Sequence, residues 1–343
     1  MVNYFNEYFI NVISDLTNNK NFNRNNNDPL INIDTNQDSF FFLPTSQNEV
    51  ETVILSLKSK PTNLNDISID VLKYLHKPIS IIITHIFNKC IDQGIYPNKL
   101  KYARVVPIYK SGPKYEVSNY RPLSTLLSIN KISEKLAFRR IISFINSCSL
   151  ISKNQFGFQK EKSTTDAIFE VTQFASKGLN SNEYVTLIFL DLKKAFDSVS
   201  HSLLMGKLFR MGFRGKVQSF LRSYLDDRYQ SVSVGEICSD YKKVKFWVPQ
   251  GSILGPILFI LFINDLLKIL CDFVSLYADD AVFGIKDKNF VNLITRLQSF
   301  INTLSNWLIN NKLFPNTQKT SLMQLSFKKF NFPLPDIFLM GIN

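Results

Sequence analysis

This chain is poor in cysteine and histidine, the residue types that form disulfides and structural zinc sites. It contains four cysteines and three histidines in 343 residues. The cysteines show no CxxC spacing, and no histidine has a partner at metal-ligand spacing. A structural zinc site and a disulfide framework are therefore not expected, and this cysteine usage is typical of a reducing, intracellular compartment.

Long apolar runs are also absent from the sequence. The longest uninterrupted apolar stretch, residues 253–263, contains Gly255 and Pro256 and is too short to span a bilayer. Asparagines and a glutamate interrupt the first residues of the chain, so no signal peptide or other targeting signal is readable. No membrane partner is expected.

Acidic residues are outnumbered by basic ones. The chain has 40 Lys and Arg against 28 Asp and Glu, which gives a net charge of +12. Residues 1–44 contain two basic and five acidic side chains, a net charge of −3, so that +15 remains for the rest of the chain. A basic body suits a polyanionic partner such as nucleic acid, although many basic proteins bind none.

The first hundred residues show two kinds of composition. Seven of the ten residues at 18–27 are asparagine, which predicts a disordered linker after a short amphipathic segment, together residues 1–45. Ser46 with Glu49 three residues later is typical of a helix start. Helices are predicted over 46–59 and 67–93, the second interrupted near Pro78, so residues 46–102 are interpreted as a helical N-terminal extension.

The segment from residue 185 onward alternates between strands and helices. Four strand-type segments are predicted, at 185–190, about 230–247 (a strand pair), 273–285 (a hairpin) and 319–327. Four helices are predicted, at about 198–211, 216–226, 256–268 and 290–312. Helices on one face of an antiparallel sheet, with acidic residues at strand ends, correspond to an α+β fold.

An aspartate pair lies at the predicted hairpin. Tyr277-Ala278-Asp279-Asp280 is flanked on both sides by short apolar runs, which places the carboxylates at a tight turn. Two unpaired carboxylates about 4 Å apart repel by roughly 4 kcal/mol at an effective dielectric of about 20. A divalent cation would relieve this repulsion, whereas a solvated bend is the alternative.

A third carboxylate favours the metal hypothesis. Asp191 directly follows the apolar run 185–190, and an acid at the end of a buried strand is poorly placed for solubility alone. Together with the hairpin acids it would form the oxygen cluster that Mg²⁺ prefers. Two metal ions held in this way can activate a hydroxyl and stabilise a leaving pyrophosphate.

These residues resemble motifs of the reverse transcriptases. Residues 189–197, Phe-Leu-Asp-Leu-Lys-Lys-Ala-Phe-Asp, are similar to the first palm motif, and Tyr-Ala-Asp-Asp is similar to the hairpin motif. Residues 249–256, Pro-Gln-Gly-Ser-Ile-Leu-Gly-Pro, resemble the second palm motif. The block 155–167 is typical of non-LTR (LINE-type) retrotransposon enzymes, although Gln159 stands where that family usually has Arg.

Two further segments complete the resemblance. Residues 105–110 and 119–124 resemble the fingers segment, and residues 316–320 resemble a motif whose lysine protonates the leaving pyrophosphate. The six segments occur in the family's order between about residues 103 and 327. The chain therefore resembles the non-LTR reverse transcriptases, and within them the jockey-like group.

The resemblance implies a role for each matched residue. Asp191, Asp279 and Asp280 would bind two Mg²⁺ ions, with Mn²⁺ as a substitute, and Lys319 would act as general acid. The implied nucleotide-binding residues are Lys110, Arg121, Phe196, Gln250 and Gly251. The implied primer and template contacts are Tyr277, Gln155 and Gly157. By residue type alone, Phe196 would be interpreted as a core residue, and the motif match reverses that interpretation; Tyr277 could fill the strand instead of stacking beside the primer terminus.

The resemblance also implies an architecture and a reaction. Residues 103–330 would form right-hand fingers and palm, and residues 331–343 the start of a connection to a thumb that is largely missing. The expected activity is RNA-directed DNA polymerisation, with an RNA template, a DNA primer or target DNA, and dNTPs as partners, in the nucleus or cytoplasm. A degenerate or maturase-like RNA-binding protein is the alternative.

Overall fold

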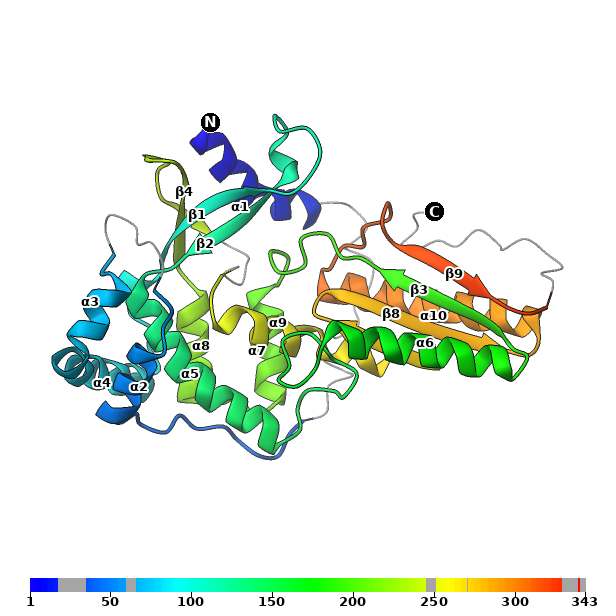
Figure 1. The fold of residues 1–343 in the computed structure, drawn as a ribbon, viewed down its shortest axis with the longest axis horizontal. Helices are drawn as coiled ribbons and strands as arrows, with labels where there is room; N and C mark the ends of the chain where they lie inside the picture. The colour runs from blue at the N-terminus through cyan, green and yellow to red at the C-terminus, as the bar shows by residue number, and fades with distance from the viewer. Residues whose placement is uncertain (18–34, 60–65, 245–250, 270, 329–338, 340–343) are drawn as a thin grey trace. The chain divides into compact units, whose positions relative to one another are not determined.

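The computed structural model describes residues 1–17, 35–59, 66–244, 251–269, 271–328 and 339. The chain divides into two compact units, each built from separate stretches of sequence. Unit 1 comprises Met1–Asp15, Asp34–Leu150 and Leu204–Leu258. Unit 2 comprises Leu16–Ile33, Ile151–Leu203 and Phe259–Asn343. Figure 1 shows the order of the elements along the chain.

Unit 1 contains a five-stranded sheet with the strand order β2-β1-β4-β5, in which β6 also pairs with β4. The strands are β1 (Tyr102–Tyr109), β2 (Tyr120–Thr125), β4 (Arg228–Val234), β5 (Ile237–Cys238) and β6 (Lys242–Val244). β1 pairs antiparallel with β2 and parallel with β4. The predicted strand pair at about 230–247 is thus found as β4 with the two short strands β5 and β6, while residues 245–250 lie outside the described residues.

Helix α1 (Val2–Thr17) packs against this sheet, as Figure 1 shows. Its Phe5 and Phe9 join a buried cluster with valines of the sheet region. Between them Asn6 is completely buried, where its amide donates to Ser239 Oγ at 2.9 Å and accepts from Gln230 at 3.0 Å. The predicted amphipathic segment at the N-terminus is therefore helical, whereas the predicted linker at 18–27 lies outside the described residues.

The remaining helices of unit 1 include the predicted N-terminal extension. They are α2 (Gln47–Leu55), α3 (Ile69–Tyr74), α4 (His76–Gln93), α5 (Ser128–Ser147), α8 (Lys216–Leu225) and most of α7 (His201–Arg210). Ser46 caps α2 by accepting from the Glu49 N–H at 3.3 Å, as predicted. The break in the second helix falls at Leu75 and not at Pro78. Pro78 lies in the first turn of α4, where a missing N–H costs nothing.

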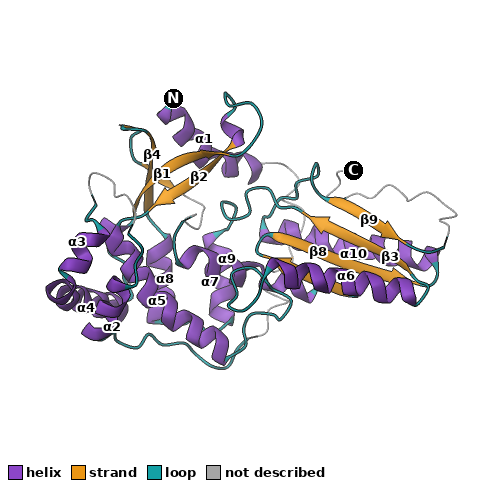
Figure 2. Cartoon of the chain, in the orientation of Figure 1, coloured by secondary structure: helices purple, strands orange, loops and turns teal. Residues whose placement is uncertain are grey.

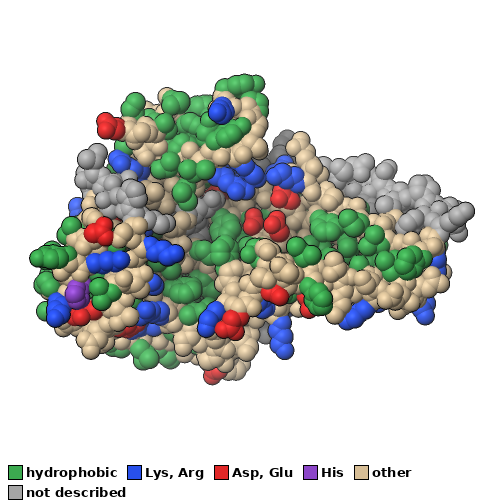
Figure 3. Space-filling view, in the orientation of Figure 1, with side chains coloured by type: hydrophobic (Ala, Val, Ile, Leu, Met, Phe, Trp, Pro, Cys, Tyr) green, Lys and Arg blue, Asp and Glu red, His purple; other side chains and the backbone are tan. Residues whose placement is uncertain are grey.

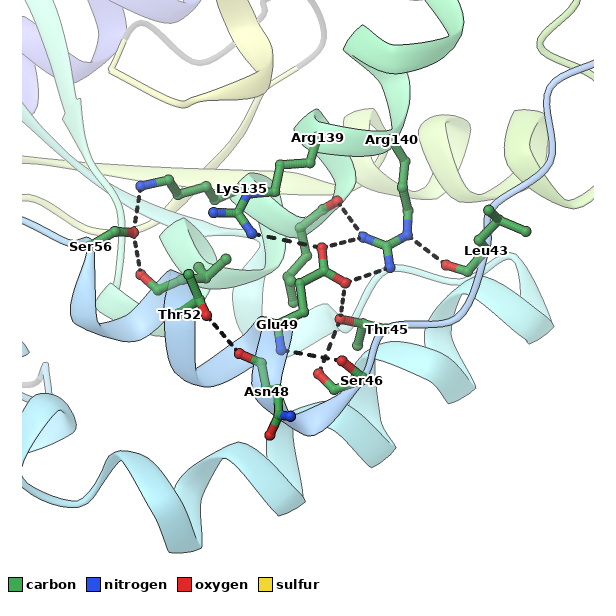
Figure 4. Close-up of polar contacts among 12 residues, drawn as sticks. Leu43, Thr45, Ser46, Asn48, Glu49, Thr52, Ser56, Lys135, Arg139 and Arg140 are labelled. Atoms are coloured by element: carbon green, nitrogen blue, oxygen red, sulfur yellow. Dashed lines mark hydrogen bonds and ion pairs between the residues drawn. The ribbon is translucent and has the colours of Figure 1, made fainter.

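A polar network joins α2 to α5 (Figure 4). The Glu49 carboxylate accepts from both terminal nitrogens of Arg140, at 2.9 and 2.8 Å. Arg140 also donates to the backbone oxygens of Leu43 and Pro44, and Thr45 donates to Glu49 at 2.7 Å. The network fixes the chain that enters α2.

Unit 2 is built on an antiparallel four-stranded sheet with the order β7-β8-β3-β9. The strands are β3 (Tyr184–Leu190), β7 (Phe273–Tyr277), β8 (Asp280–Asp287) and β9 (Ser321–Leu325). The remaining regular elements are α6 (Thr164–Asn180), α10 (Phe290–Asn311) and, after α9 (Leu254–Ile263), a 3₁₀ turn at Asn264–Lys268. The fold class is α+β, as predicted, and the predicted helix 256–268 is an α-helix only as far as Ile263.

Helices cover both faces of the unit 2 sheet, whereas the sequence predicted helices on one face. Neighbouring strand residues point to opposite faces: Phe283 of β8 meets Phe300 of α10, with ring centroids 5.0 Å apart. A Cβ added at the next residue, Gly284, would clash with Phe174 of α6. In Figure 2 the ribbon of α6 lies in front of the strands and that of α10 behind them. No helix among the described residues is long and apolar enough to cross a membrane.

Candidate active site

The aspartate pair lies at a two-residue turn between β7 and β8. Tyr277 pairs with Asp280 across the hairpin, which leaves Ala278 and Asp279 as the turn residues. Ala278 has a φ of 58°, a left-handed conformation that costs a non-glycine residue roughly 1–2 kcal/mol. Asp279 is half-buried and Asp280 is exposed. The predicted hairpin is confirmed, with Asp279 in its turn and Asp280 as the first residue of β8.

Asp191 lies at the same end of the sheet. In the β3–β8 ladder Leu190 pairs with Ala281, so the next residue of β3 comes opposite Asp280. Asp191 is half-buried, and its Oδ2 accepts from Asn316 Nδ2 at 2.7 Å. The pairing of β3 with β8 thus places the three predicted metal ligands at the same end of the sheet. Asp191 directly follows β3, Asp279 lies in the β7–β8 turn, and Asp280 begins β8.

The loop before β9 is tied to Asp191 through its backbone. The Asn316 N–H donates to the Asp191 carbonyl oxygen at 2.8 Å, and the Asp191 N–H donates to Thr320 Oγ1 at 3.3 Å. Lys319, the predicted general acid, lies in this loop with an exposed side chain, and its N–H donates to the Asn316 carbonyl at 3.0 Å. The sequence assigned no role to Asn316 or Thr320, although both lie within the matched motif.

Gln155 and Gly157 contact the same turn from the other side. Gln155 is completely buried, and its Oε1 accepts from the N–H groups of Gly157 at 2.8 Å and Ala278 at 3.1 Å. The Phe156 N–H donates to the Leu276 carbonyl at 2.7 Å. A Cβ added at Gly157 would clash with the Ala278 backbone. In this structure the two residues that were predicted to contact primer or template hold the aspartate turn.

Two aromatic residues of the predicted site have different surroundings. Phe196 is half-buried and stacks on Phe259, with centroids 4.2 Å apart and an interplanar angle of 22°. Phe158 meets the Phe196 ring edge-on at 6.4 Å. Tyr277, beside the acids, is 37% exposed, which leaves part of its ring open to a ligand.

Unit 1 carries the residues that were predicted to bind the triphosphate. Arg121 of β2 pairs with Ile108 of β1, and the Lys110 N–H continues the ladder by donating to the Asn119 carbonyl at 2.9 Å. Because Lys110 follows Ile108 by two residues, it shares a face of the hairpin with Arg121. Both side chains are exposed. The hairpin presents two cations on one face, an arrangement suited to a polyphosphate.

The second palm motif is described from Gly251 onward. Gly251 has a φ of 110°, and a Cβ there would clash with the carbonyl oxygen of Ser124 in β2. Only glycine can therefore occupy this position without moving the strand. Gln250, the other predicted nucleotide contact of this motif, lies outside the described residues.

The donor set of unit 2 fits a hard divalent cation. Mg²⁺ is usually held by one or two carboxylates, with substrate phosphates and water completing the coordination, and three carboxylates lie at this edge. Within the described residues, no three side chains of the metal-binding types are gathered closely enough around one point to form a complete metal site.

Comparisons with known proteins show which family the chain resembles. Residues 108–333 match the family model described as reverse transcriptase (RNA-dependent DNA polymerase). The chain is 31% identical over 265 residues to the RNA-directed DNA polymerase from mobile element jockey of Drosophila melanogaster. It is 30% identical over 292 residues to the probable RNA-directed DNA polymerase from transposon BS of the same organism. These alignments cover 75% and 81% of this chain but only 29% and 32% of the two relatives.

A solved structure shows the same fold. The apo telomerase of Candida tropicalis, truncated from its C-terminal domain, superposes with a TM-score of 0.50 at 16% sequence identity. The match covers 73% of this chain and 55% of that structure. At this identity the likeness concerns the fold, and it agrees with the fingers-and-palm interpretation of the sequence.

Proposed function

Because the chain belongs to the reverse transcriptase family, we propose that it catalyses RNA-directed DNA polymerisation for a non-LTR retrotransposon. The observation that carries the proposal is the strand register, which places Asp191, Asp279 and Asp280 at the same end of the unit 2 sheet. The proposed partners are an RNA template, a DNA primer or target DNA, and dNTPs. The proposed location is the nucleus or the cytoplasm.

In the proposed reaction a primer 3′-hydroxyl attacks the α-phosphate of a dNTP. Asp191 and Asp279 would hold two Mg²⁺ ions with the help of Asp280, and when bound these ions would activate the hydroxyl and neutralise phosphate charge. The Asn316 amide, which donates to Asp191, keeps one carboxylate oxygen oriented. Lys319, held in the loop beside Asp191, would donate the proton to the leaving pyrophosphate.

The other residues would bind and orient the substrates. Lys110 and Arg121, on one face of the β1–β2 hairpin, would hold the triphosphate. Phe196, fixed by stacking on Phe259, would lie under the sugar and exclude a 2′-hydroxyl, and Gln250 and Gly251 would meet the nascent base pair. Tyr277 would contact the primer terminus, and Gln155 and Gly157 would serve the template by fixing the turn beside it.

Asp279→Asn tests the metal assignment. The substitution keeps the shape of the side chain but removes the charge that a metal ion needs, so we expect dNTP incorporation on a primed RNA template to be lost at every Mg²⁺ or Mn²⁺ concentration. Binding of the primer–template and the melting temperature should stay close to wild type. Asp227→Asn is the matched control, because it alters the other Asp-Asp pair of the chain, whose Asp227 is paired with Lys243 at 2.6 Å.

Two outcomes would contradict the proposal. Wild-type incorporation by Asp279→Asn would remove Asp279 from the metal site. Tight binding of primer–template by the wild-type chain, without any incorporation in either metal, would leave nucleic-acid binding without catalysis as the function.

A further inference from the structure

A buried carboxylate of unit 1 has no role in the reaction described above. Glu134 lies on α5 and is completely buried. Its Oε2 accepts from the Ile253 N–H at 2.6 Å, and its Oε1 accepts from the Tyr224 hydroxyl at 2.8 Å. The pKa of this carboxyl is raised, because burial outweighs the lowering effect of the Ile253 and Leu254 N–H groups, the Tyr224 hydroxyl and the nearby Arg228 charge. A buried acid is costly unless such donors surround it.

The donors belong to the start of helix α9. Ile253 directly precedes the helix, which begins at Leu254, and the first N–H groups of a helix have no partner within it. A carboxylate is the most favourable acceptor at this end, because the helix dipole is positive there. Ser252 reinforces the same end by accepting from the Gly255 N–H at 2.9 Å.

The segment that Glu134 holds is the one that carries the second palm motif. Gly251 lies two residues before Ile253, and its close approach to the Ser124 carbonyl sets it directly on β2. β2 also carries Arg121, the predicted triphosphate contact. Residues 251–254 are thus fixed on one side by the strand and on the other by the Glu134 carboxylate.

The neighbouring arginine does not account for the burial of Glu134. Arg228 is 1% exposed, and its Nη1 donates to the Tyr224 carbonyl at 3.0 Å. Its Nε and Nη2 have no hydrogen-bond partner among the described residues. A carboxylate that served only to neutralise this guanidinium would accept from those nitrogens, but Glu134 accepts from the backbone of the motif.

We propose that Glu134 is a positioning residue for nucleotide binding: its carboxylate holds the start of α9 so that Gly251, two residues before Ile253, keeps the position on β2 from which it receives the incoming dNTP. The inference rests on the proposed polymerase function. It assigns to α5 a role in substrate affinity and not only in the stability of the core.

Glu134→Gln tests this role, because it keeps the size of the side chain while one acceptor oxygen becomes a donor. We expect the KM for dNTP to rise about tenfold, the change expected from losing one hydrogen bond to a charged group. The kcat and the Kd for primer–template should change by less than about twofold, since the metal-binding residues are untouched. Amide hydrogen exchange in a peptide covering residues 251–258 should become faster.

Glu49→Gln is the matched control. Glu49 is a half-buried carboxylate of the same unit that holds Arg140 and the start of α2, and none of its hydrogen bonds among the described residues goes to α9. Its loss should lower the melting temperature while leaving the KM for dNTP and the exchange of residues 251–258 at wild-type values. This comparison separates a general loss of stability from a loss of positioning.

The outcomes are distinguishable. If Glu134→Gln lowers the melting temperature but leaves both the KM for dNTP and the exchange of residues 251–258 unchanged, Glu134 is a core residue and the inference is wrong. If Glu134→Gln does not fold, Glu134→Asp replaces it, because it keeps the charge but withdraws it by one methylene. A raised KM for dNTP and faster exchange of residues 251–258 in Glu134→Asp would support the inference, and wild-type values of both would contradict it. If the wild type incorporates no dNTP, the proposed function fails, while the exchange rates still test whether Glu134 holds the start of α9.

Discussion

At the scale of single residues, Gln155 holds the aspartate turn through a direct hydrogen bond. It offers one carbonyl oxygen to two backbone N–H groups, one of them on the left-handed Ala278. In Gln155→Leu both N–H groups would be left unpaired, at a cost of roughly 1–3 kcal/mol each. We expect the kcat for incorporation to fall at least about tenfold, with little change in template affinity, because the turn carries the metal ligands.

The measurement is single-turnover incorporation beside a binding titration of primer–template. Gln173→Leu serves as the control, since Gln173 accepts from Lys177 of the same helix, α6, and has no hydrogen bond to the turn among the described residues. Weaker template binding at unchanged kcat in Gln155→Leu would instead favour a direct template contact.

Phe196 allows a second test at this scale. Phe196→Val should raise ribonucleotide incorporation relative to deoxynucleotide, because the smaller side chain leaves room for a 2′-hydroxyl. The ratio of kcat/KM for dNTP and rNTP measures the effect, and Phe169→Val, an exposed position of α6, is the control. An unchanged ratio together with a lower melting temperature would make Phe196 a core residue that only packs on Phe259.

The sequence predicted where the acidic residues lie better than it predicted the residues that hold them in place. Asp191 and Asp279 are recognisable because each adjoins an apolar strand, and strands are local patterns. The contact of Gln155 with Ala278 joins residues far apart in sequence, and only the fold brings them together. Glu134 could have been found from a weaker pattern. It lies on the same helix face as the apolar residues Ala137 and Ile141, and an acidic residue on an apolar face indicates a buried carboxylate with a hydrogen-bond donor beside it.

At the scale of elements, most segments were predicted because their periodicity is local. The helix 290–312 is found as Phe290–Asn311, and the strand 185–190 as Tyr184–Leu190. The coverage of both sheet faces was missed, although an apolar run without alternation is typical of a strand buried on both sides. The parallel pairing of β1 with β4 depends on contacts between distant segments and left no sequence pattern.

The polar network between α2 and α5, formed by Glu49 and Arg140, makes a pH-dependent contribution to the free energy of unfolding. The hydrogen bonds from Arg140 hold the pKa of Glu49 below its usual value. A carboxyl with a lowered pKa in the folded state stabilises the fold above its unfolded pKa, and this contribution is lost as the pH falls through the folded pKa. We expect Glu49→Gln to cost roughly 1–3 kcal/mol at neutral pH and much less below about pH 3.

Thermal unfolding of both proteins between about pH 7 and pH 3 measures this difference. Glu51→Gln is the control on the same helix, because Glu51 accepts only from neutral groups, Gln47 and Ser80, among the described residues. A stability difference for Glu49→Gln that stayed constant over this range would show that its ionisation does not contribute.

At the scale of the whole molecule, the net charge of +12 predicts how the chain binds nucleic acid. Figure 3 shows Lys and Arg side chains scattered over the face that it presents, without one continuous basic patch. Several are already paired with acids, for example Lys216 with Asp92 at 2.7 Å and Lys242 with Glu7 at 2.8 Å. Binding should therefore combine several separate phosphate contacts.

Each phosphate that the protein neutralises releases counterions, so the logarithm of the association constant falls with the logarithm of the salt concentration by about 0.9 per contact on a duplex and about 0.7 on a single strand. We expect a clear fall in primer–template affinity between about 50 and 200 mM salt. The slope should be shallower for single-stranded RNA, since each contact contributes less there. Lys216→Gln is the control: its ammonium is already paired with Asp92, so the slope should change by less than about 0.3, well under the change of about 0.9 that one lost contact would cause. An affinity independent of salt would show that stacking and base contacts, and not the basic excess of the chain, dominate binding.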